Sequence, residues 1–308
     1  MKATHRGRAG QVDRIRWAFK ELLDQRLSEI TIGRVERWRA RRNQQRRLES
    51  PEKKPPRPVS RATVNRDIQA LRAALARATE WGSLSMNPLA RMKQGTEDEN
   101  ATIRYLSRDE EQRLRNALAN RDDSRRAARK SAHEWRNERG YQPWPEYGMY
   151  TDYTPLVLVA LNTGLRRGEF LQLRWRDVAF SHRNLTVRGE GAKTGQTRHL
   201  PLNSEVVNVL KNWKPSDAEA DWCVFSGSTN MTPLTEARKA WSAVLSKAKI
   251  RWFRFHDLRH TFASKLVMTG VDLNTVRELL GHKKISMTLR YAHLAPQHKA
   301  EAVEKLVR

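Results

Sequence analysis

The chain has 308 residues, enough for two domains of ordinary size, and carries a formal net charge of +25 at pH 7 from 59 Lys and Arg against 34 Asp and Glu. A surface this basic binds a polyanion by releasing counterions, so nucleic acid is the expected partner, ahead of a membrane. One cysteine excludes an intramolecular disulfide, and the sequence has neither a run of roughly 20 apolar residues nor a signal-peptide core, so we expect a soluble, cytoplasmic protein.

Helical periodicity dominates the N-terminal part of the chain. Residues 11–48 carry two apolar stripes at helical spacing, made of Val12, Ile15, Phe19, Leu22 and Leu23, and of Ile32, Val35 and Trp38. After a basic, Pro-rich break at 49–58, the pattern predicts a longer helix over 63–81, whose apolar face consists of Val64, Ile68, Leu71, Leu75 and Ala78. An all-helical domain is therefore expected at 1–95.

The same part of the chain is rich in arginine. Between Arg34 and Arg66 lie 12 Lys and Arg against 3 Asp and Glu. Such a run is usually a solvated face, but arginine suits forked contacts with phosphate, and here the charge lies along helices that also have a core stripe. We therefore expect this domain to clamp DNA, with Arg61 and Arg66 as phosphate contacts.

A polar segment without periodicity precedes Ser107 and Glu110, which have the spacing of a helix-capping box. This pattern predicts a linker at 96–103 and a second domain at 104–308. Within that domain, an insertion at 121–153 begins with a basic helical pattern and continues with an aromatic loop. The sequence assigns no role to this insertion.

Two helices joined by a tight turn are predicted next. The first, apolar helix ends at Thr163-Gly164 and the second starts near Gly168, so Arg166 lies in the turn that leads to a helix N-terminus. Free amides and the helix dipole make such a position favourable for an oxyanion. Taken alone, the pattern favours an ordinary helical hairpin with a surface arginine pair.

Short strands follow at 178–180, 185–188 and 198–202, and a Gly-rich turn before the last of them carries Lys193 at its tip. A lysine in a polar hairpin loop is nearly always simply solvated. The expected fold is mainly α with a small antiparallel β-sheet. It combines an all-α N-terminal domain with a mixed α+β second domain.

The C-terminal part of the chain holds most of the residue types that carry chemistry. A helix that runs up to Gly270 puts His256, Arg259 and His260 on one face, because side chains three and four residues apart share a face. A single histidine or tyrosine in a helical region is more often packed or surface-exposed than catalytic. The prediction therefore depends on several such residues coming together.

A second helix is predicted from a cap at Asp272 or Asn274 to Gly281, a natural position for a left-handed C-terminal residue, and it delivers a histidine at its end. Ser286 is expected to cap a third short segment, which carries Tyr291. These residues lie at the ends and faces of adjoining helices, so their side chains can converge on one point.

The run from His256 to His260 also resembles the H-E-x-x-H helix of zinc proteases, with Asp257 in place of the glutamate and Glu278 downstream as a third ligand to consider. Aspartate is one methylene shorter than the usual general base, and Arg259 would put a permanent cation beside the metal. We therefore predict no metal site and no cofactor.

Three C-terminal segments, HDLRHTFAS, LLGH and TLRYAHL, together resemble the boxes of the tyrosine recombinase family, the phage-type integrases. The family's H-x-x-R motif falls on His256 and Arg259. Its leucine-leucine-glycine-histidine box ends at His282, and its nucleophile falls on Tyr291, nine residues later, which is the interval usual in the family.

Upstream segments extend the resemblance. TGLRRGE matches the family's T-G-L-R-x-x-E box, which implies that Arg166 is the first catalytic arginine and Glu169 its supporting carboxylate. The hairpin loop is similar to one whose lysine reaches into the DNA minor groove, and Lys193 fits that lysine, although Gln196 stands where many relatives have a second one. Residues 60–92 resemble the second half of the family's core-binding domain.

The resemblance implies a site-specific recombinase that needs neither metal nor ATP. Tyr291 would attack DNA and hold its 3′-phosphate, while Arg166 and Arg259 would grip the phosphate oxygens. Lys193 would protonate the leaving 5′-oxygen, and the two histidines would donate hydrogen bonds or help to move protons.

The resemblance also implies a homotetramer on two double-stranded DNA attachment sites, strand exchange through a Holliday junction, and integration or excision of a phage or mobile element. A directionality or DNA-bending factor is a further expected partner. The alternatives are a type IB topoisomerase and a catalytically silent DNA-binding protein. Many relatives carry an N-terminal arm-binding domain, so the chain is expected to be either an armless recombinase or a fragment.

Overall fold

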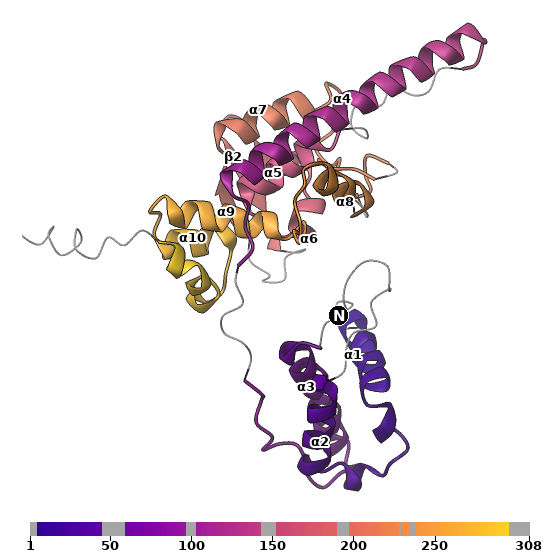
Figure 1. Cartoon of the computed structure of the whole chain (residues 1–308), viewed down its shortest axis with the longest axis vertical. Helices are drawn as coiled ribbons and strands as arrows, with labels where there is room; N and C mark the ends of the chain where they lie inside the picture. The colour runs from indigo at the N-terminus through magenta and orange to yellow at the C-terminus, as the bar shows by residue number, and fades with distance from the viewer. Residues whose placement is uncertain are drawn as a thin grey trace, which may run out of the picture. The chain divides into compact units, whose positions relative to one another are not determined.

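The structure is a computed structural model, and it describes residues 5–44, 59–96, 103–142, 152–189, 197–227, 229–234 and 238–295. The chain forms two compact units, Met1–Ala101 and Thr102–Arg308 (Figure 1). Within the described ranges, no helix is both long enough and apolar enough to cross a membrane.

The described part of the first unit is all helical. It contains α1 (His5–Ala18), the 3-10 helices Lys20–Leu22 and Leu27–Glu29, α2 (Ile32–Gln44) and α3 (Arg61–Glu80). α3 begins after Ser60, whose hydroxyl accepts a hydrogen bond from the amide of Thr63. Four residues of the predicted apolar face of α3 lie in the core of this unit together with Phe19 and Trp38, and the fifth, Ala78, is half-buried.

The apolar stripe predicted for α1 is only partly correct, because Val12 and Leu23 are 46% and 47% exposed. The chain leaves the α-helix after Ala18, so the helical phase does not continue to Leu23. On α1 itself, Arg14 turns towards α3, where its guanidinium lies 2.9 Å from the buried carboxylate of Asp67, and Val12 stays outside.

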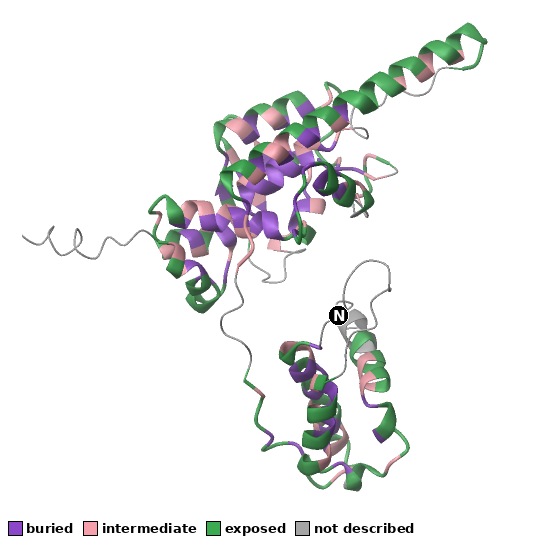
Figure 2. Cartoon of the chain, viewed as in Figure 1, coloured by how far each residue is buried: buried purple, intermediate pink, exposed green. Residues whose placement is uncertain are grey.

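The central helix of the second unit is α5 (Thr154–Thr163). It is apolar on every side and packs against α4 (Arg108–Glu138), α7 (Ser204–Trp213) and α9 (Asp257–Met268). The remaining helices are α6 (Arg167–Leu171), α8 (Arg238–Lys247), α10 (Leu273–Leu280) and the 3-10 helices Trp175–Asp177, Ile285–Met287 and Leu289–Leu294. The residues with the least exposure gather around α5 and α9 (Figure 2).

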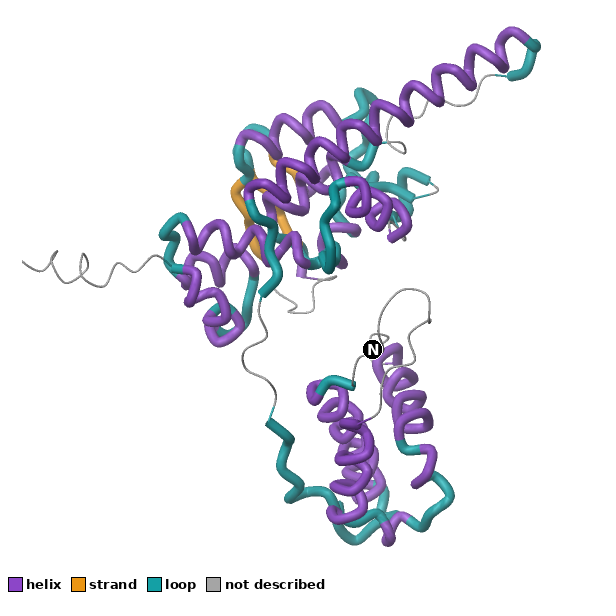
Figure 3. The backbone as a smooth tube through the Cα atoms, in the orientation of Figure 1, coloured by secondary structure: helices purple, strands orange, loops and turns teal. Residues whose placement is uncertain are grey.

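α4 starts at the capping box that the sequence predicts. The hydroxyl of Ser107 accepts from the amide of Glu110, and the carboxylate of Glu110 accepts from the amide of Ser107, both at 3.1 Å. The helix continues unbroken into the insertion and extends beyond the other helices of this unit (Figure 3). Its buried Asp122 accepts from the amides of Tyr153 and Thr154, so α4 caps the N-terminus of α5.

The sheet has three antiparallel strands in the order β1 (Val178–Ala179), β2 (Asn184–Val187) and β3 (Arg198–Pro201). This agrees with the predicted fold class, a mainly helical protein with a small antiparallel sheet. Leu185 pairs with Val178 on one side and with Leu200 on the other, and all three side chains lie in the core. The same register puts Arg198 opposite Val187.

The C-terminal helices have the caps predicted from the sequence, with one exception. The carboxylate of Asp272 accepts from the amides of Asn274 and Thr275 at 2.9 Å, and Gly281 ends α10 with a left-handed φ of +62°. The prediction for Ser286 was wrong. It lies inside a 3-10 helix and caps nothing, because the chain forms two consecutive 3-10 helices there instead of one capped segment.

Candidate active site

Arg166 lies in the turn between α5 and α6, as the sequence predicts. Its Nη1 donates to Oε1 of Glu169 at 2.9 Å, its amide donates to Oε2 at 3.0 Å, and its Nη2 donates to the carbonyl of Gly281 at 2.9 Å. The turn depends on Gly164, which has a φ of +58° and where a Cβ atom would collide with the ring of Phe262. The position of Arg166 is therefore fixed by both its backbone and its side chain.

A further arginine, Arg198 at the start of β3, binds the same carboxylate. Its two Nη atoms donate to the two oxygens of Glu169 at 3.1 and 2.7 Å, in buried surroundings. Burial alone would raise the pKa of Glu169, but the hydrogen bonds and charge of Arg198, together with the hydrogen bonds of Arg166, lower the pKa to about 2. The carboxylate therefore stays ionised and holds both guanidinium groups.

Arg259 on α9 joins two helix ends and is only 4% exposed. Its Nη1 donates to the carbonyl of Gly164 and its Nη2 to the carbonyl of Leu280, both at 2.7 Å. Burial and then the charge of Arg166 lower the pKa of Arg259 to about 9, which leaves it cationic at neutral pH. An entering anion would relieve the repulsion between these two cations.

His282 follows the left-handed Gly281 at the end of α10. Its Nδ1 lies 2.9 Å from the hydroxyl of Thr288, and both residues are buried. Burial, followed by the charges of Arg259 and Arg166, lowers the pKa of His282 to about 3, so the imidazole is neutral at pH 7. The end of α10 thus gathers two arginines through its carbonyls and adds a histidine beside them.

Tyr291 is 1% exposed, and its hydroxyl lies 2.7 Å from Nδ1 of His260 on α9. His256 meets His260 edge to face, with ring centroids 5.3 Å apart. Burial, with a smaller effect of Arg259, lowers the pKa of His256. Burial raises the pKa of Tyr291 against the opposing charges of Arg259 and Arg290.

The structure brings most of the predicted site residues together in the second unit: Arg166, Glu169, His256, Arg259, His282 and Tyr291. Lys193 lies outside the described residues. Arg61 and Arg66 are exposed on α3, in the first unit. Their roles stay predictions.

The sequence alone did not single out two residues of this cluster, Arg198 and Thr288. It placed His260 on one helix face with His256 and Arg259 but assigned it no role in a recombinase site. Arg198 and Thr288 gave no signal, because their contacts with Glu169 and His282 depend on strand register and on the 3-10 turns.

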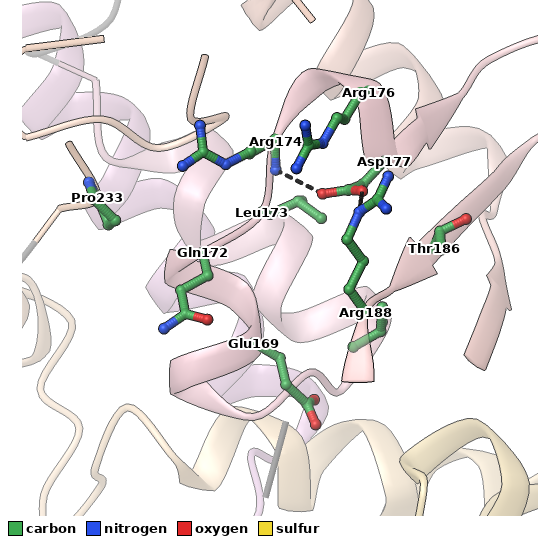
Figure 4. A pocket seen from close by; sticks show the side chains of 10 residues that line it. Glu169, Gln172, Leu173, Arg174, Arg176, Asp177, Thr186, Arg188 and Pro233 are labelled. Atoms are coloured by element: carbon green, nitrogen blue, oxygen red, sulfur yellow. Dashed lines mark hydrogen bonds and ion pairs between the residues drawn. The ribbon is translucent and has the colours of Figure 1, made fainter. Parts of the chain in front are cut away.

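A pocket of about 400 Å³ adjoins Glu169 (Figure 4). In it, the buried carboxylate of Asp177 accepts from the amide of Arg174 at 3.1 Å and from Nε of Arg188 at 2.6 Å. Arg188 directly follows β2, so Asp177 fixes the start of the segment that leads to Lys193.

A cleft of about 700 Å³ beside the C-terminal end of α10 is lined by Arg198, His282 and Lys283, among others. Its cationic and imidazole groups suit an anion. A phenol held beside histidines, together with two arginines that retain further N–H groups, is suited to nucleophilic attack on a phosphodiester.

Among the described residues, no group of three His, Cys, Asp or Glu side chains could hold a metal ion. In the run that resembles a zinc-protease helix, Asp257 is buried and accepts from the amide of Arg254 at 2.7 Å and from its Nη2 at 2.9 Å. His260 binds Tyr291. Two side chains of that alternative, Asp257 and His260, are therefore engaged in other contacts.

Comparison with known proteins agrees with the family resemblance seen in the sequence of the C-terminal half of the chain. Residues 145–298, half of the chain, match the phage integrase family. An integrase of Salmonella phage P22 is 30% identical over 263 residues, which cover 82% of this chain and 59% of the relative. A XerC-like tyrosine recombinase of Caldanaerobacter subterraneus is 31% identical over 187 residues, which cover 49% of this chain and 48% of the relative.

The fold is also shared with solved structures. A Tn1549 transposon integrase in complex with transposon right end DNA superposes with a TM-score of 0.69 at 20% identity, over all of this chain and 95% of that one. The chain spans between about half and three-fifths of the length of the two curated relatives. The family match and the tyrosine recombinase names of the relatives agree with the boxes in the sequence, and the chain belongs to the phage integrase family of tyrosine recombinases.

Proposed function

We propose that the chain is a site-specific DNA recombinase, an integrase that cuts and rejoins DNA through a 3′-phosphotyrosine for the integration or excision of a phage or mobile element. The observation that carries this proposal is the Tyr291 hydroxyl, held by a histidine in a cluster with Arg166, Arg259 and His282. Its support includes the family, the name of the P22 integrase and the DNA complex of the Tn1549 integrase.

Arg166 and Arg259 stabilise the charge that develops on the phosphoryl oxygens. Each Nη atom of a guanidinium carries two hydrogens, and the bonds from Arg259 to backbone carbonyls use one on each. The remaining hydrogens are available to non-bridging oxygens, and a planar guanidinium can contact two of them at once, which an ammonium group cannot reproduce. Glu169 keeps Arg166 in position throughout.

Tyr291 attacks phosphorus, and the 5′-oxygen leaves with a proton from Lys193. His256 and His282, which burial keeps neutral, donate hydrogen bonds to the phosphate or relay protons. The ester to Tyr291 retains the energy of the broken bond, so rejoining to another strand needs no ATP, and the side chains named here supply each step without a metal.

The N-terminal domain, 1–95, clamps DNA, the linker is 96–103, and the catalytic domain is 104–308. Arg61 and Arg66, exposed on α3, contact phosphates. Recombination follows when a homotetramer holds two double-stranded attachment sites, with a directionality or DNA-bending factor as an additional partner. A recombinase acts where the DNA lies, so we assign it to the cytoplasm.

Covalent trapping tests the proposal. The chain is incubated with a library of nicked duplexes from the mobile element and denatured in SDS, and the attached DNA is sequenced. We expect adducts with the wild type and none with Tyr291→Phe, which keeps its salt-sensitive DNA binding. Tight binding by the wild type without any adduct would overturn the proposal in favour of a silent DNA-binding protein.

A further inference from the structure

The nucleophile of the proposed reaction has one neighbour that the mechanism above leaves unused. The Tyr291 ring lies in a small core between α9, α10 and the last 3-10 helix, with Ala263, Val267 and Leu280. His260 reaches into this setting from α9, and its Nδ1 lies 2.7 Å from the phenolic oxygen. Within the described residues, this is the hydrogen bond that the Tyr291 hydroxyl makes.

The carboxylates of the cluster and Nδ1 of His282 are engaged elsewhere. Glu169 binds two arginines and stays ionised at a pKa of about 2. Asp257 binds Arg254, and Nδ1 of His282 meets the hydroxyl of Thr288. His256 contacts the ring of His260, and it is His260 whose Nδ1 lies within hydrogen-bond distance of the phenol, so His260 is the group positioned to take its proton.

The charge states of the two partners allow the phenol to be the donor of this hydrogen bond. Burial and then the neighbouring His256 lower the pKa of His260 to about 4, with further lowering from Arg290 and Arg254 that Asp257 opposes. The imidazole is therefore neutral at pH 7, while burial raises the pKa of Tyr291 and keeps the phenol protonated. In the neutral tautomer that carries its hydrogen on Nε2, Nδ1 is an acceptor and the phenol donates to it, and this is the tautomer that proton transfer requires.

We propose that His260 is a catalytic residue, the general base that accepts the phenolic proton of Tyr291 during strand cleavage. As the bond from Oη to phosphorus forms and the bond from phosphorus to the 5′-oxygen breaks, the proton moves from Oη to Nδ1, and the 5′-oxygen takes a proton from the general acid. In rejoining, His260 returns the proton to the phenolate, so none is consumed over a full cycle. This inference rests on the proposed recombinase function.

The arrival of DNA makes this transfer easier. Its phosphate brings negative charge to a cluster dominated by cations, which raises the proton affinity of the buried histidines. A base that is weak without DNA therefore becomes stronger when the scissile phosphate is bound. Proton transfer of this kind contributes typically a factor of ~10²–10⁴ to a rate.

The test measures single-turnover adduct formation on the duplex recovered by trapping, with the wild type, His260→Ala and His260→Asn. Asparagine puts an amide oxygen near the place of Nδ1, so it keeps an acceptor for the hydrogen bond but cannot take up a proton. We expect both variants to form adduct ~10²-fold or more slowly. Their rates should keep rising with pH, because hydroxide then replaces the missing base.

A second substrate separates the base from the acid. In a duplex with a 5′-bridging phosphorothiolate, the leaving sulfur needs no proton, so loss of a general acid is rescued while loss of a general base is not. We expect Lys193→Ala to be rescued by this substrate and His260→Ala to remain slow. His293→Ala serves as the matched control, because His293 is an exposed histidine in the same 3-10 helix as Tyr291, and its rate should equal that of the wild type.

Three outcomes would each overturn the assignment of His260 as the base. They are a wild-type rate of adduct formation in His260→Ala, a wild-type rate in His260→Asn, and rescue of His260→Ala by the phosphorothiolate. Both His260 variants are first compared with the wild type for duplex binding and urea midpoint, and the asparagine variant decides the question when the alanine variant does not fold. Absence of any adduct with the wild type would instead contradict the proposed recombinase function itself.

Discussion

Glu169 holds Arg166 and Arg198 on one buried carboxylate, and removing Arg198 takes two charge-assisted hydrogen bonds from that carboxylate. We predict that Arg198→Met destabilises the protein by about 3 kcal/mol or more. The double variant Glu169→Gln, Arg198→Met removes both charges and should recover part of that loss. Urea unfolding measures the free energy of unfolding of the wild type, both single variants and the double variant. If the losses of the two single variants add up to the loss of the double variant, the two side chains are not coupled, which would contradict the shared ion pair.

The buried histidines make stability depend on pH. Folding lowers the pKa of His260 to about 4 and that of His282 to about 3, below the usual value of 6.5. Below pH 6.5 the unfolded chain therefore binds protons that the folded chain excludes. Stability is complete above that pH and falls on acidification towards pH 4, by up to about 1.4 kcal/mol per pH unit for each histidine.

His282→Asn checks this pH dependence, because asparagine can keep a hydrogen bond to Thr288 but does not titrate. Free energies of unfolding are measured in urea at several values between pH 7.5 and pH 5. We expect the variant to show a shallower decline than the wild type. If the free energy of unfolding falls equally in both proteins, protonation of His282 does not contribute to the loss of stability at low pH.

At the scale of elements, the C-terminal end of α10 organises the site. The carbonyls of Leu280 and Gly281 receive Arg259 and Arg166, and this geometry needs the left-handed φ of +62° at Gly281. A Cβ atom at Gly281 would also lie 2.9 Å from the guanidinium of Arg198. The end of this helix is therefore intolerant of a side chain for two separate reasons.

We predict that Gly281→Ala lowers the free energy of unfolding by about 1–3 kcal/mol, because it combines backbone strain with a close contact. It should also slow adduct formation on bound DNA, since the carbonyl that receives Arg166 shifts. Gly168→Ala is the matched control, because a Cβ atom at Gly168 in α6 meets nothing within 4 Å. Unfolding in urea checks both variants, and equal stabilities would contradict the account.

At the scale of the whole molecule, the net charge of +25 predicts DNA binding that weakens steeply with salt. Each phosphate contact contributes about one unit to the slope of log affinity against log salt. Arg61→Gln and Arg66→Gln should each reduce that slope by about one and leave the rate of adduct formation on saturated DNA unchanged. Titrations of fluorescent duplex at several salt concentrations measure the slope.

Arg77→Gln is the control for these two variants, because Arg77 lies in the last turn of the same helix, 3.1 Å from the carboxylate of Glu80, whose charge opposes a phosphate there. Its slope should equal that of the wild type. If the slopes for Arg61→Gln and Arg66→Gln equal that of the wild type, these two residues of α3 do not contact DNA phosphates.

Much of the second unit could be predicted from local patterns. The capping box at Ser107, the left-handed glycines and the short strands are encoded over a few residues, and so are the boxes that carry Arg259 and Tyr291. What could not be predicted is tertiary. The contact of Arg198 with Glu169 depends on how β3 packs, and the bond from His260 to Tyr291 on how the 3-10 helices return to α9.

The most direct measurement of the central claim is to identify the amino acid and the DNA end in a trapped complex. The adduct is digested with a protease and a nuclease, and mass spectrometry locates the nucleotide on the peptide. The account predicts a 3′-phosphate linked to Tyr291 and a free 5′-hydroxyl on the other strand end. Attachment through a 5′-phosphate, or to another residue that persists in Tyr291→Phe, would contradict it.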